Sequence, residues 1–397
     1  MDRRRFLELA SAGLPALGLA GRLYAAPQSA PRLLLVFLRG GYDCANLLVP
    51  YASDFYYEAR PHIAIARPDP AGGGGGAVAL DADWALAPAV RDSIGVLYAQ
   101  GQALFVPFAG TDDLSRSHFE TQDSIELGQP AQARHDFGSG FLARLLEIVS
   151  APAPIAFTDS LPLVFKGPAA VPNISLKGIG KPAFDERQAA ILVDLYRGHH
   201  LQAAVAGGLD LRQEVAQAMA DEMRDANRGA IDTKGFELEA ERTGRLLRDH
   251  YRLGFIDVGG WDTHVGEGSV QGTLATNLAS LGRGLRTLSQ TLGPQWRDTV
   301  VVVISEFGRT FRENGNGGTD HGHGSVYWVL GGAINGGRIA GEQARIERSS
   351  LFQDRDYPVL NDYRAVLGGL FRSMWGLSNT QLERVFPGAE AVDLKIL

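Results

Sequence analysis

The sequence predicts an α/β protein whose mostly parallel sheet is flanked by helices, and three observations support this prediction. Two uninterrupted apolar runs, Arg32–Leu38 and Thr299–Ser305, are typical of strands buried on both faces. Helical patterns alternate with shorter strand-like runs along the rest of the chain, and this alternation favours a parallel sheet covered by helices. The 397 residues are 45% hydrophobic, which is ample material for a core.

Apolar runs of strand length define the remaining strands, and longer patterns with helical period define the helices. The expected strands, in chain order, are 32–38, 104–108, 154–157, 171–176, 252–257, 299–305 and 325–330. The expected helices are 84–99, 117–127, 137–149, 184–205, 210–228, 231–250, 269–292 and 361–374. Because the stretch from about 184 to 250 is helical and poor in glycine, we expect a helical insertion or cap within a single domain spanning 27–397.

The N-terminal 26 residues resemble a secretory signal. Arg3 and Arg4 are followed by a short apolar stretch from Leu7 to Gly21 and by small residues up to Ala26. A basic start, a modest apolar segment and a small-residue cleavage site describe an export signal, and the paired arginines match the twin-arginine type. We therefore expect 1–26 to engage the twin-arginine export machinery. The mature protein would be periplasmic or extracellular, without a stable membrane span. The alternative is an ordinary amphipathic helix.

Composition excludes several classes of function. Lys and Arg number 38 against 45 Asp and Glu, giving a net charge of −7, which disfavours a nucleic-acid partner. The single cysteine, Cys44, excludes an intramolecular disulfide framework and a multi-cysteine zinc site. No Gly-x-Ser-x-Gly or His-Glu-x-x-His motif occurs, which weighs against an α/β-hydrolase esterase and that type of metalloprotease.

Asp43 follows the first strong strand, directly after Arg39, the Gly40–Gly41 pair and Tyr42. Ligand crevices of parallel α/β sheets lie beyond the carboxyl ends of the strands, and paired glycines let the backbone pass close to a ligand. Asp43 is therefore a candidate site residue at the rim of such a crevice. The alternative is that it only caps a turn.

Ser117 begins a predicted helix and has two interpretations. With Glu120 it fits a Ser-x-x-Glu capping box. A hydroxyl at a helix N-terminus also lies where backbone N–H groups stabilise anions. The same geometry could therefore make Ser117 a nucleophile or a metal ligand.

Asp262 and His264 follow another predicted strand, after the pair Gly259–Gly260. In an extended segment, residues two apart point the same way, so both side chains could reach one metal ion. A carboxylate and an imidazole together suit zinc, manganese or iron. The structural alternative is a histidine with no ligand role.

The segment after the strand Thr299–Ser305 is the richest in chemistry. Glu306 comes directly after the strand, and a glycine-rich loop then presents three ligating groups within four residues; these are Asp320, His321 and His323. Arg309 could hold a phosphate-like anion in bidentate fashion. Together with the segments above, these residues predict a hydrolytic site with one or two divalent ions, which could be zinc, manganese, magnesium or iron.

These motifs resemble a known family over nearly the whole mature chain. The matching segments are Phe37–Asp43, Ser117–Asp123, Gly260–His264, Ser305–Thr310 and Gly318–Gly322. On them the chain resembles the exported bacterial family catalogued as domain of unknown function 1501, which is similar to the alkaline phosphatase and sulfatase superfamily. That resemblance implies an alkaline-phosphatase-like core. Relatives usually carry an Asp-His pair where this chain has Glu306-Phe307, and wider spacing than Asp262-x-His264.

The resemblance also implies roles for individual residues. Asp43 would match a metal ligand after the first strand, and Ser117 would match the nucleophile. Asp262, His264, Glu306 and a histidine of the 321–323 loop would complete the metal site. The expected function is an exported metal-dependent hydrolase of a small phosphate or sulfate ester, in which Arg39 or Arg309 orients the anion. The alternatives are a catalytically degenerate member that binds an envelope polymer or partner protein, and a metal-binding chaperone-like factor.

Overall fold

The computed structural model describes residues 31–69, 75–133, 136–149, 153–176, 186–207, 209 and 236–397. The predicted signal at 1–26, the predicted helix 210–228 and much of the expected insertion at 184–250 lie outside these residues. Predictions about those parts stay predictions.

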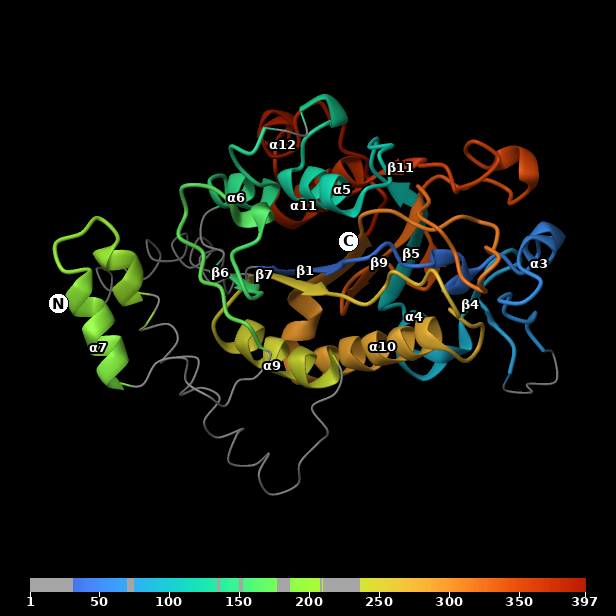
Figure 1. Ribbon diagram of the computed structural model, residues 1–397, viewed down its shortest axis with the longest axis horizontal. Coiled ribbons are helices and arrows are strands. Elements are labelled where there is room, and N and C mark those ends of the chain that lie inside the picture. Colours follow the sequence, from blue (N-terminus) through green and yellow to red (C-terminus); the bar gives the residue numbers. More distant parts are fainter. Residues whose placement is uncertain are drawn as a thin grey trace, which may run out of the picture. The chain divides into compact units, whose positions relative to one another are not determined.

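The main sheet of the described residues has eight strands (Figure 1) in the order β10-β5-β9-β8-β1-β7-β6, with β11 pairing to β5. The strands are β1 (Arg32–Leu38), β5 (Ala103–Gly110), β6 (Pro154–Phe157), β7 (Leu253–Val258), β8 (Thr299–Ser305), β9 (Ser325–Gly331), β10 (Arg338–Ile339) and β11 (Asn361–Asp362). Every long strand coincides within two residues with a predicted one.

Only β9 runs against the others: it pairs antiparallel with both β5 and β8, whereas all remaining pairs in the described part of this sheet are parallel. The prediction of a mostly parallel sheet flanked by helices is therefore confirmed. Because β9 is reversed, its first residues lie at the edge where β1, β5, β7 and β8 end. The loops that follow those strands and the loop that precedes β9 consequently meet at one edge of the sheet.

Alternate residues of β1 face two hydrophobic cores, as expected for a central strand covered on both sides. Leu34 and Val36 pack with the core formed by α9 (Phe236–Asp249) and α10 (Thr273–Leu292). Leu33 and Leu35 pack with the opposite core, formed by α6 (Phe141–Leu146), α11 (Tyr363–Trp375) and α12 (Asn379–Val385). Figure 1 shows these two sets of helices on opposite faces of the sheet. No described helix is both long enough and apolar enough to span a membrane.

The other elements are short and connect these layers. A small sheet has the order β2-β4-β3. Its strands and the remaining helices are β2 (Leu48–Val49), β3 (Val78–Ala79), β4 (Ala85–Leu86), α3 (Asp54–Ala59), α4 (Val96–Ala99), α5 (His118–Leu127) and α7 (Glu186–Leu195). Single turns of 3₁₀ helix occur at 44–46, 88–90, 131–133, 163–165 and 348–350, and a longer one at 293–298.

The predicted helix 137–149 is shorter in the structure, as α6 (Phe141–Leu146), and the predicted helix 184–205 corresponds to α7 (Glu186–Leu195). Two further predicted elements have a different structure. The expected helix 84–99 is divided into β4, a 3₁₀ turn at Pro88–Val90, a π-helical turn at Arg91–Gly95 and α4, because Pro88 has no N–H and fits only the first turn of a helix. The expected strand 171–176 forms a single bridge, between Asn173 and Ala156 of β6. Pro172 accepts a hydrogen bond there but has no N–H with which to extend the ladder.

Candidate metal centre

Loops from three places in the chain bring three histidines and one aspartate together at the carboxyl edge of the sheet. His118 begins α5, after the loop that follows β5. Asp262 and His264 lie in the loop after β7, and His321 lies in the loop between β8 and β9. We call these four residues the three-histidine cluster.

The Oδ1 atom of Asp262 is the centre of this cluster. It lies 3.0 Å from the Nε2 of His264, 3.3 Å from the Nε2 of His321 and 3.5 Å from the Nε2 of His118. The Nε2 atoms of His264 and His321 are themselves 3.0 Å apart. Three imidazole nitrogens therefore lie within 3.5 Å of one carboxylate oxygen.

Each of these histidines is held by its other ring nitrogen. The pairs are His118 Nδ1 with Glu306 Oε1 at 2.8 Å, His264 Nδ1 with Asp320 Oδ1 at 3.2 Å, and His321 Nδ1 with the carbonyl oxygen of Arg116 at 3.0 Å. A carbonyl oxygen and an ionised carboxylate only accept hydrogen bonds, so each Nδ1 must carry the proton. In a neutral ring the lone pair is then on Nε2, directed into the cluster. Metal-binding histidines have this arrangement.

The atoms that face one another in the cluster are hydrogen-bond acceptors, and a bound cation would give them a common partner. The converging atoms are acceptors, and Arg309 is the donor that reaches them, through Nη2 to Asp262 Oδ1 at 2.5 Å. The buried Nε2 of His118 has no hydrogen-bond partner among the described residues. Ligand atoms around a tetrahedral zinc ion are about 3.3 Å apart when the bonds are about 2.0 Å long. The Oδ1 of Asp262 lies at comparable distances from the Nε2 atoms of His321 and His118, 3.3 Å and 3.5 Å. His118, Asp262 and His321 form a group whose ligand atoms all lie within 4.8 Å of one another, and His264 lies beside it. The residues therefore fit a divalent metal ion.

Glu306 supports His118 from a fully buried position. Its carboxylate also accepts hydrogen bonds from the Gly40 N–H at 2.8 Å and from Gln122 Nε2 at 2.9 Å. Burial alone would raise the pKa of Glu306, but the hydrogen bonds from His118 and Gln122 lower it below the ordinary value. The same hydrogen bond raises the pKa of His118. Glu306, which the sequence suggested as a ligand, thus lies behind His118, and Asp320, suggested likewise, lies behind His264.

Asp43 is engaged elsewhere. Its two carboxylate oxygens accept hydrogen bonds from Arg60 Nη1 and Nη2, the latter at 2.9 Å, and both side chains are almost completely buried. Burial would raise the pKa of Asp43, but the charge of Arg60 lowers it. The structure therefore places Asp43 in an ion pair with Arg60 rather than among the atoms that surround Asp262.

Both arginines expected to orient an anion already use their donors. Arg309 is buried and donates to the carbonyl oxygens of Gly40 and Gly41 and to Asp262, among others. Arg39 donates to Asp257 at 2.8 Å, and its remaining nitrogens bond Gln122 at 2.9 Å and Glu126 at 2.8 Å. Arg309 therefore connects neighbouring loops at the edge of the sheet, whereas Arg39 connects the end of β1 to β7 and α5.

Ser117 and His323 flank the cluster. Ser117 is the N-cap residue of α5, but its side chain makes no capping hydrogen bond, so the expected capping box does not form. It is half-buried and directly precedes His118. His323 is buried against Phe352, with ring centroids 5.1 Å apart. Burial lowers the pKa of His323 to about 4, so it is neutral at pH 7.

His118 is the cluster member that sequence reasoning missed. It stands inside the Ser117–Glu120 pattern, which fits a helix cap. The signal that could have identified it is its neighbour at position i+4: His118 and Gln122 lie on one face of α5, and both bond the same Oε1 of Glu306. Arg116 was missed because it holds His321 through a backbone carbonyl, which no side-chain pattern reveals.

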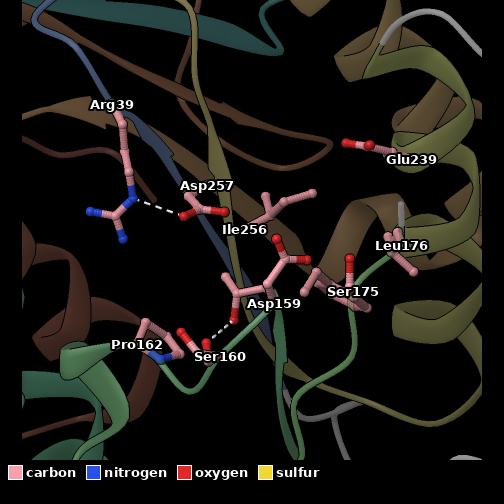
Figure 2. Close-up of a pocket in the computed structure, with 11 residues that line it drawn as sticks. Arg39, Asp159, Ser160, Pro162, Ser175, Leu176, Glu239, Ile256 and Asp257 are labelled. Carbon is pink, nitrogen blue, oxygen red and sulfur yellow. Dashed lines mark hydrogen bonds and ion pairs between the residues drawn. The ribbon is translucent and has the colours of Figure 1, made fainter. Parts of the chain in front are cut away.

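A cavity of about 280 Å³ lies beyond the ends of β6 and β7 (Figure 2). Arg39, Asp159, Glu239 and Asp257 are its charged lining residues, and Figure 2 shows the ion pair between Arg39 and Asp257 at its wall. Arg39 also bonds Gln122, which in turn bonds Glu306. A continuous set of hydrogen bonds thus connects the cavity wall with the partner of His118.

Comparison with known proteins gives one family and several related folds. The family described as protein of unknown function (DUF1501) matches residues 30–386. No curated protein matches the chain in sequence.

Solved structures with related folds include three bacterial proteins. The chain is similar to a protein in the alkaline phosphatase superfamily from Vibrio parahaemolyticus, with 11% identity and a TM-score of 0.36, covering 79% of this chain and 62% of that one. It is similar to the soluble domain of lipooligosaccharide phosphoethanolamine transferase A from Neisseria meningitidis, with 10% identity and a TM-score of 0.38, covering 77% of this chain and 79% of that one. It is also similar to the lipoteichoic acid synthase LtaP from Listeria monocytogenes, with 8% identity and a TM-score of 0.41, covering 93% of this chain and 76% of that one.

Proposed function

The chain belongs to the family described as protein of unknown function (DUF1501), and from that premise we propose that it is an exported, metal-dependent hydrolase of phosphate or sulfate esters. One observation supports this proposal above all others. Three histidines direct their Nε2 atoms at one carboxylate oxygen of Asp262, while their Nδ1 atoms are each held by an acceptor. Such a donor set suits a divalent metal of the zinc, manganese or iron type.

The residues around the cluster suggest how the reaction is divided. A bound metal would polarise an ester oxygen and stabilise the negative charge that develops on it. We assign the nucleophile to Ser117, which directly precedes His118 and whose side chain makes no capping bond. Its oxygen would bond to phosphorus or sulfur as the bond to the alcohol oxygen breaks, and the serine proton would pass to the departing alcohol. Water would then cleave the serine ester, which restores the hydroxyl group and releases phosphate or sulfate. Because the guanidinium groups of Arg39 and Arg309 are held by other groups of the protein, the anion would depend chiefly on the metal and on the N-terminus of α5.

The metal is tested by elemental analysis of the mature protein after native export. We expect about one equivalent in the wild type and none in Asp262→Ala/His264→Ala. The control is Asp249→Ala/His250→Ala, which removes the same residue types at the end of α9 and should retain the metal. A wild-type protein that binds no zinc, manganese or iron, even after soaking, would contradict the proposal.

The reaction is tested with a panel of phosphate and sulfate esters. We expect metal-dependent turnover that Ser117→Ala abolishes, a loss of at least about 10³-fold if Ser117 forms the covalent intermediate. Metal content measured on the same variant shows whether the site survives the substitution. Unchanged turnover in Ser117→Ala would exclude it as the nucleophile.

A second candidate function has its own supporting observation. Arg309, the arginine that bonds Asp262, directs Nε, Nη1 and Nη2 at other groups of the protein, as in a site that keeps its metal but no longer activates an anionic ester. Such a protein would bind an envelope polymer or a partner protein. A full complement of metal with no turnover on the ester panel would favour this second function.

Export is proposed from the N-terminal sequence. Arg3, Arg4 and the apolar stretch that follows support a twin-arginine signal and a periplasmic or extracellular location. We expect Arg3→Lys/Arg4→Lys to retain the precursor in the cytoplasm, and cell fractionation measures this. Normal export of that variant would contradict the proposed route.

A further inference from the structure

Asp356 is a buried carboxylate bound to an arginine from a distant part of the chain. Its Oδ2 atom accepts hydrogen bonds from Arg116 Nε at 2.9 Å and Nη2 at 2.6 Å. Asp356 itself is fixed by backbone bridges to Phe352 and to Thr310, the residue after Arg309. The carboxylate therefore joins the loop before α5 to the loop after β8.

Arg116 has a backbone conformation that needs such support. Its φ angle is +53°, in the left-handed region that a residue with a long side chain adopts only at a cost. Two charge-assisted hydrogen bonds to a buried carboxylate oxygen help to offset that cost. The side chain of Arg116 thus stabilises the orientation of its own carbonyl group.

That carbonyl group is the partner of His321. The Arg116 oxygen accepts the hydrogen bond from His321 Nδ1 at 3.0 Å, which places the lone pair of His321 on Nε2. His321 Nε2 in turn faces His264 and Asp262. The next two residues after Arg116 are Ser117 and His118, so the same backbone segment also positions the proposed nucleophile and another ligand.

We propose that Asp356 is a positioning residue: by clamping Arg116, it fixes the Nδ1–H tautomer of His321 and directs the lone pair of Nε2 at the metal. This inference rests on the proposed metal function, which it deepens. Asp356 touches no ligand atom and acts only through the carbonyl group of Arg116. Outer partners of metal-binding histidines are typically worth 10–100-fold in metal affinity.

The test compares Asp356→Asn and Arg116→Lys with a control on the same loop, Asp354→Asn, which loses ion pairs to the exposed Arg348 and the partly exposed Arg312. The first readout needs no metal: nitrogen NMR of the histidine rings at pH 8 reports the tautomer of each. We expect His321 to be protonated on Nδ1 in the wild type and the control. In Asp356→Asn and Arg116→Lys, the two clamp variants, the His321 ring should shift toward the Nε2–H tautomer that free histidine favours. A merely structural loss of stability would not change the tautomer of the folded protein.

The second readout is zinc affinity, measured with a competing chromophoric chelator. We expect Asp356→Asn and Arg116→Lys to bind zinc about 10–100-fold more weakly than the wild type, with the control unchanged. If the tautomer and the affinity of both clamp variants equal those of the wild type, the inference is overturned. If the wild type binds no zinc, the proposed function fails, while the tautomer measurement still decides whether Asp356 positions His321.

Discussion

At the scale of single residues, a buried arginine limits how many metal ions the site can hold. Asp43 pairs with Arg60, and Glu267 lies in the same buried group, where it accepts hydrogen bonds from Thr263 and Thr319. Arg60 supplies a positive charge that a second metal ion would otherwise bring. Both oxygens of Asp43 bond Arg60 in a fully buried pair, so a second ion there would be buried next to a guanidinium group, which is unfavourable. Asp262 bonds Arg309 through Oδ1 but is 46% exposed, so water screens the repulsion at that position. The sequence left one or two ions open, and this geometry favours one.

We therefore expect Asp43→Asn/Arg60→Gln to retain the single metal ion of the wild type. Both partners are replaced, because removing one would leave a buried charge unpaired at a cost of about 3–5 kcal/mol. Elemental analysis beside Asp262→Ala/His264→Ala checks this. Two equivalents in the wild type that fall to one in the double variant would show instead that Asp43 holds a second ion.

Glu267 gives a prediction of pH dependence. Burial and the neighbouring Asp43 carboxylate raise the pKa of Glu267, so the folded protein keeps its proton where the unfolded chain has lost it. The folded state then binds more protons than the unfolded state between the ordinary pKa and the raised one. The contribution of Glu267 to the free energy of unfolding is therefore fully present below the ordinary pKa of a glutamate. It is lost as the pH rises through the raised pKa of the folded state.

The variant Glu267→Gln, which resembles the protonated carboxyl group, should remove this dependence. We expect it to unfold at a higher temperature than the wild type at pH 8 and at nearly the same temperature near pH 4.5. Thermal unfolding at both pH values measures the difference. A variant less stable than the wild type at pH 8 would mean that the ionised carboxylate is the form the fold requires.

Some residues of the candidate site could be predicted from their type and their place after a strand. The others could not, because their partners are set by long-range contacts. Asp262, His264 and His321 could be selected because ligating side chains cluster in glycine-rich loops after strands. No local pattern shows that Arg60, 17 residues along the chain, neutralises Asp43. No local pattern shows either that Arg309 donates hydrogen bonds to backbone oxygens more than 260 residues away. Such partners are set by the tertiary fold.

At the scale of elements, the strands were predictable because burial on both faces leaves uninterrupted apolar runs. β1 and β8 have the bounds that their apolar runs indicate. The direction of β9 was not predictable, since an apolar run has no direction. Its reversal matters for function: His321 and His323 precede β9 yet lie at the edge where β8 ends.

The loop after β1 and the loop after β7 lie in close contact at Gly40, and this contact gives a prediction. Gly40 has a φ of +125°, and a Cβ atom there would lie 2.8 Å from the backbone nitrogen of Asp262. Gly40→Ala should therefore destabilise the protein by about 1–3 kcal/mol and weaken metal binding by displacing Asp262. Gly259→Ala is the matched control, because a Cβ atom at Gly259 meets open space. Denaturant unfolding and zinc titration measure both effects, and equal behaviour of the two variants would contradict the argument.

At the scale of the whole molecule, the sheet and the three-histidine cluster are held by different interactions. The sheet is held by two hydrophobic cores that do not involve the cluster. The residues of the three-histidine cluster, in contrast, come from loops attached to β5, β7, β8 and β9. The hydrophobic cores do not hold these loops, which depend on hydrogen bonds and ion pairs. A bound metal ion would connect the loops to one another. Its removal should therefore make the loops at the carboxyl edge more mobile while the sheet stays folded.

Chelation should then lower stability without unfolding the protein. A ligand present at about 100 times its dissociation constant stabilises the folded state by about 2.7 kcal/mol, and the wild type should lose this amount when the metal is removed. Hydrogen exchange should rise in 111–118, 259–267 and 306–324 but stay slow in β1 and β8. Asp262→Ala/His264→Ala serves as the control, since chelator should not change its stability or exchange. If β1 and β8 exchange as fast as the loops after chelation, the metal supports the core itself, and the separation between sheet and site is wrong.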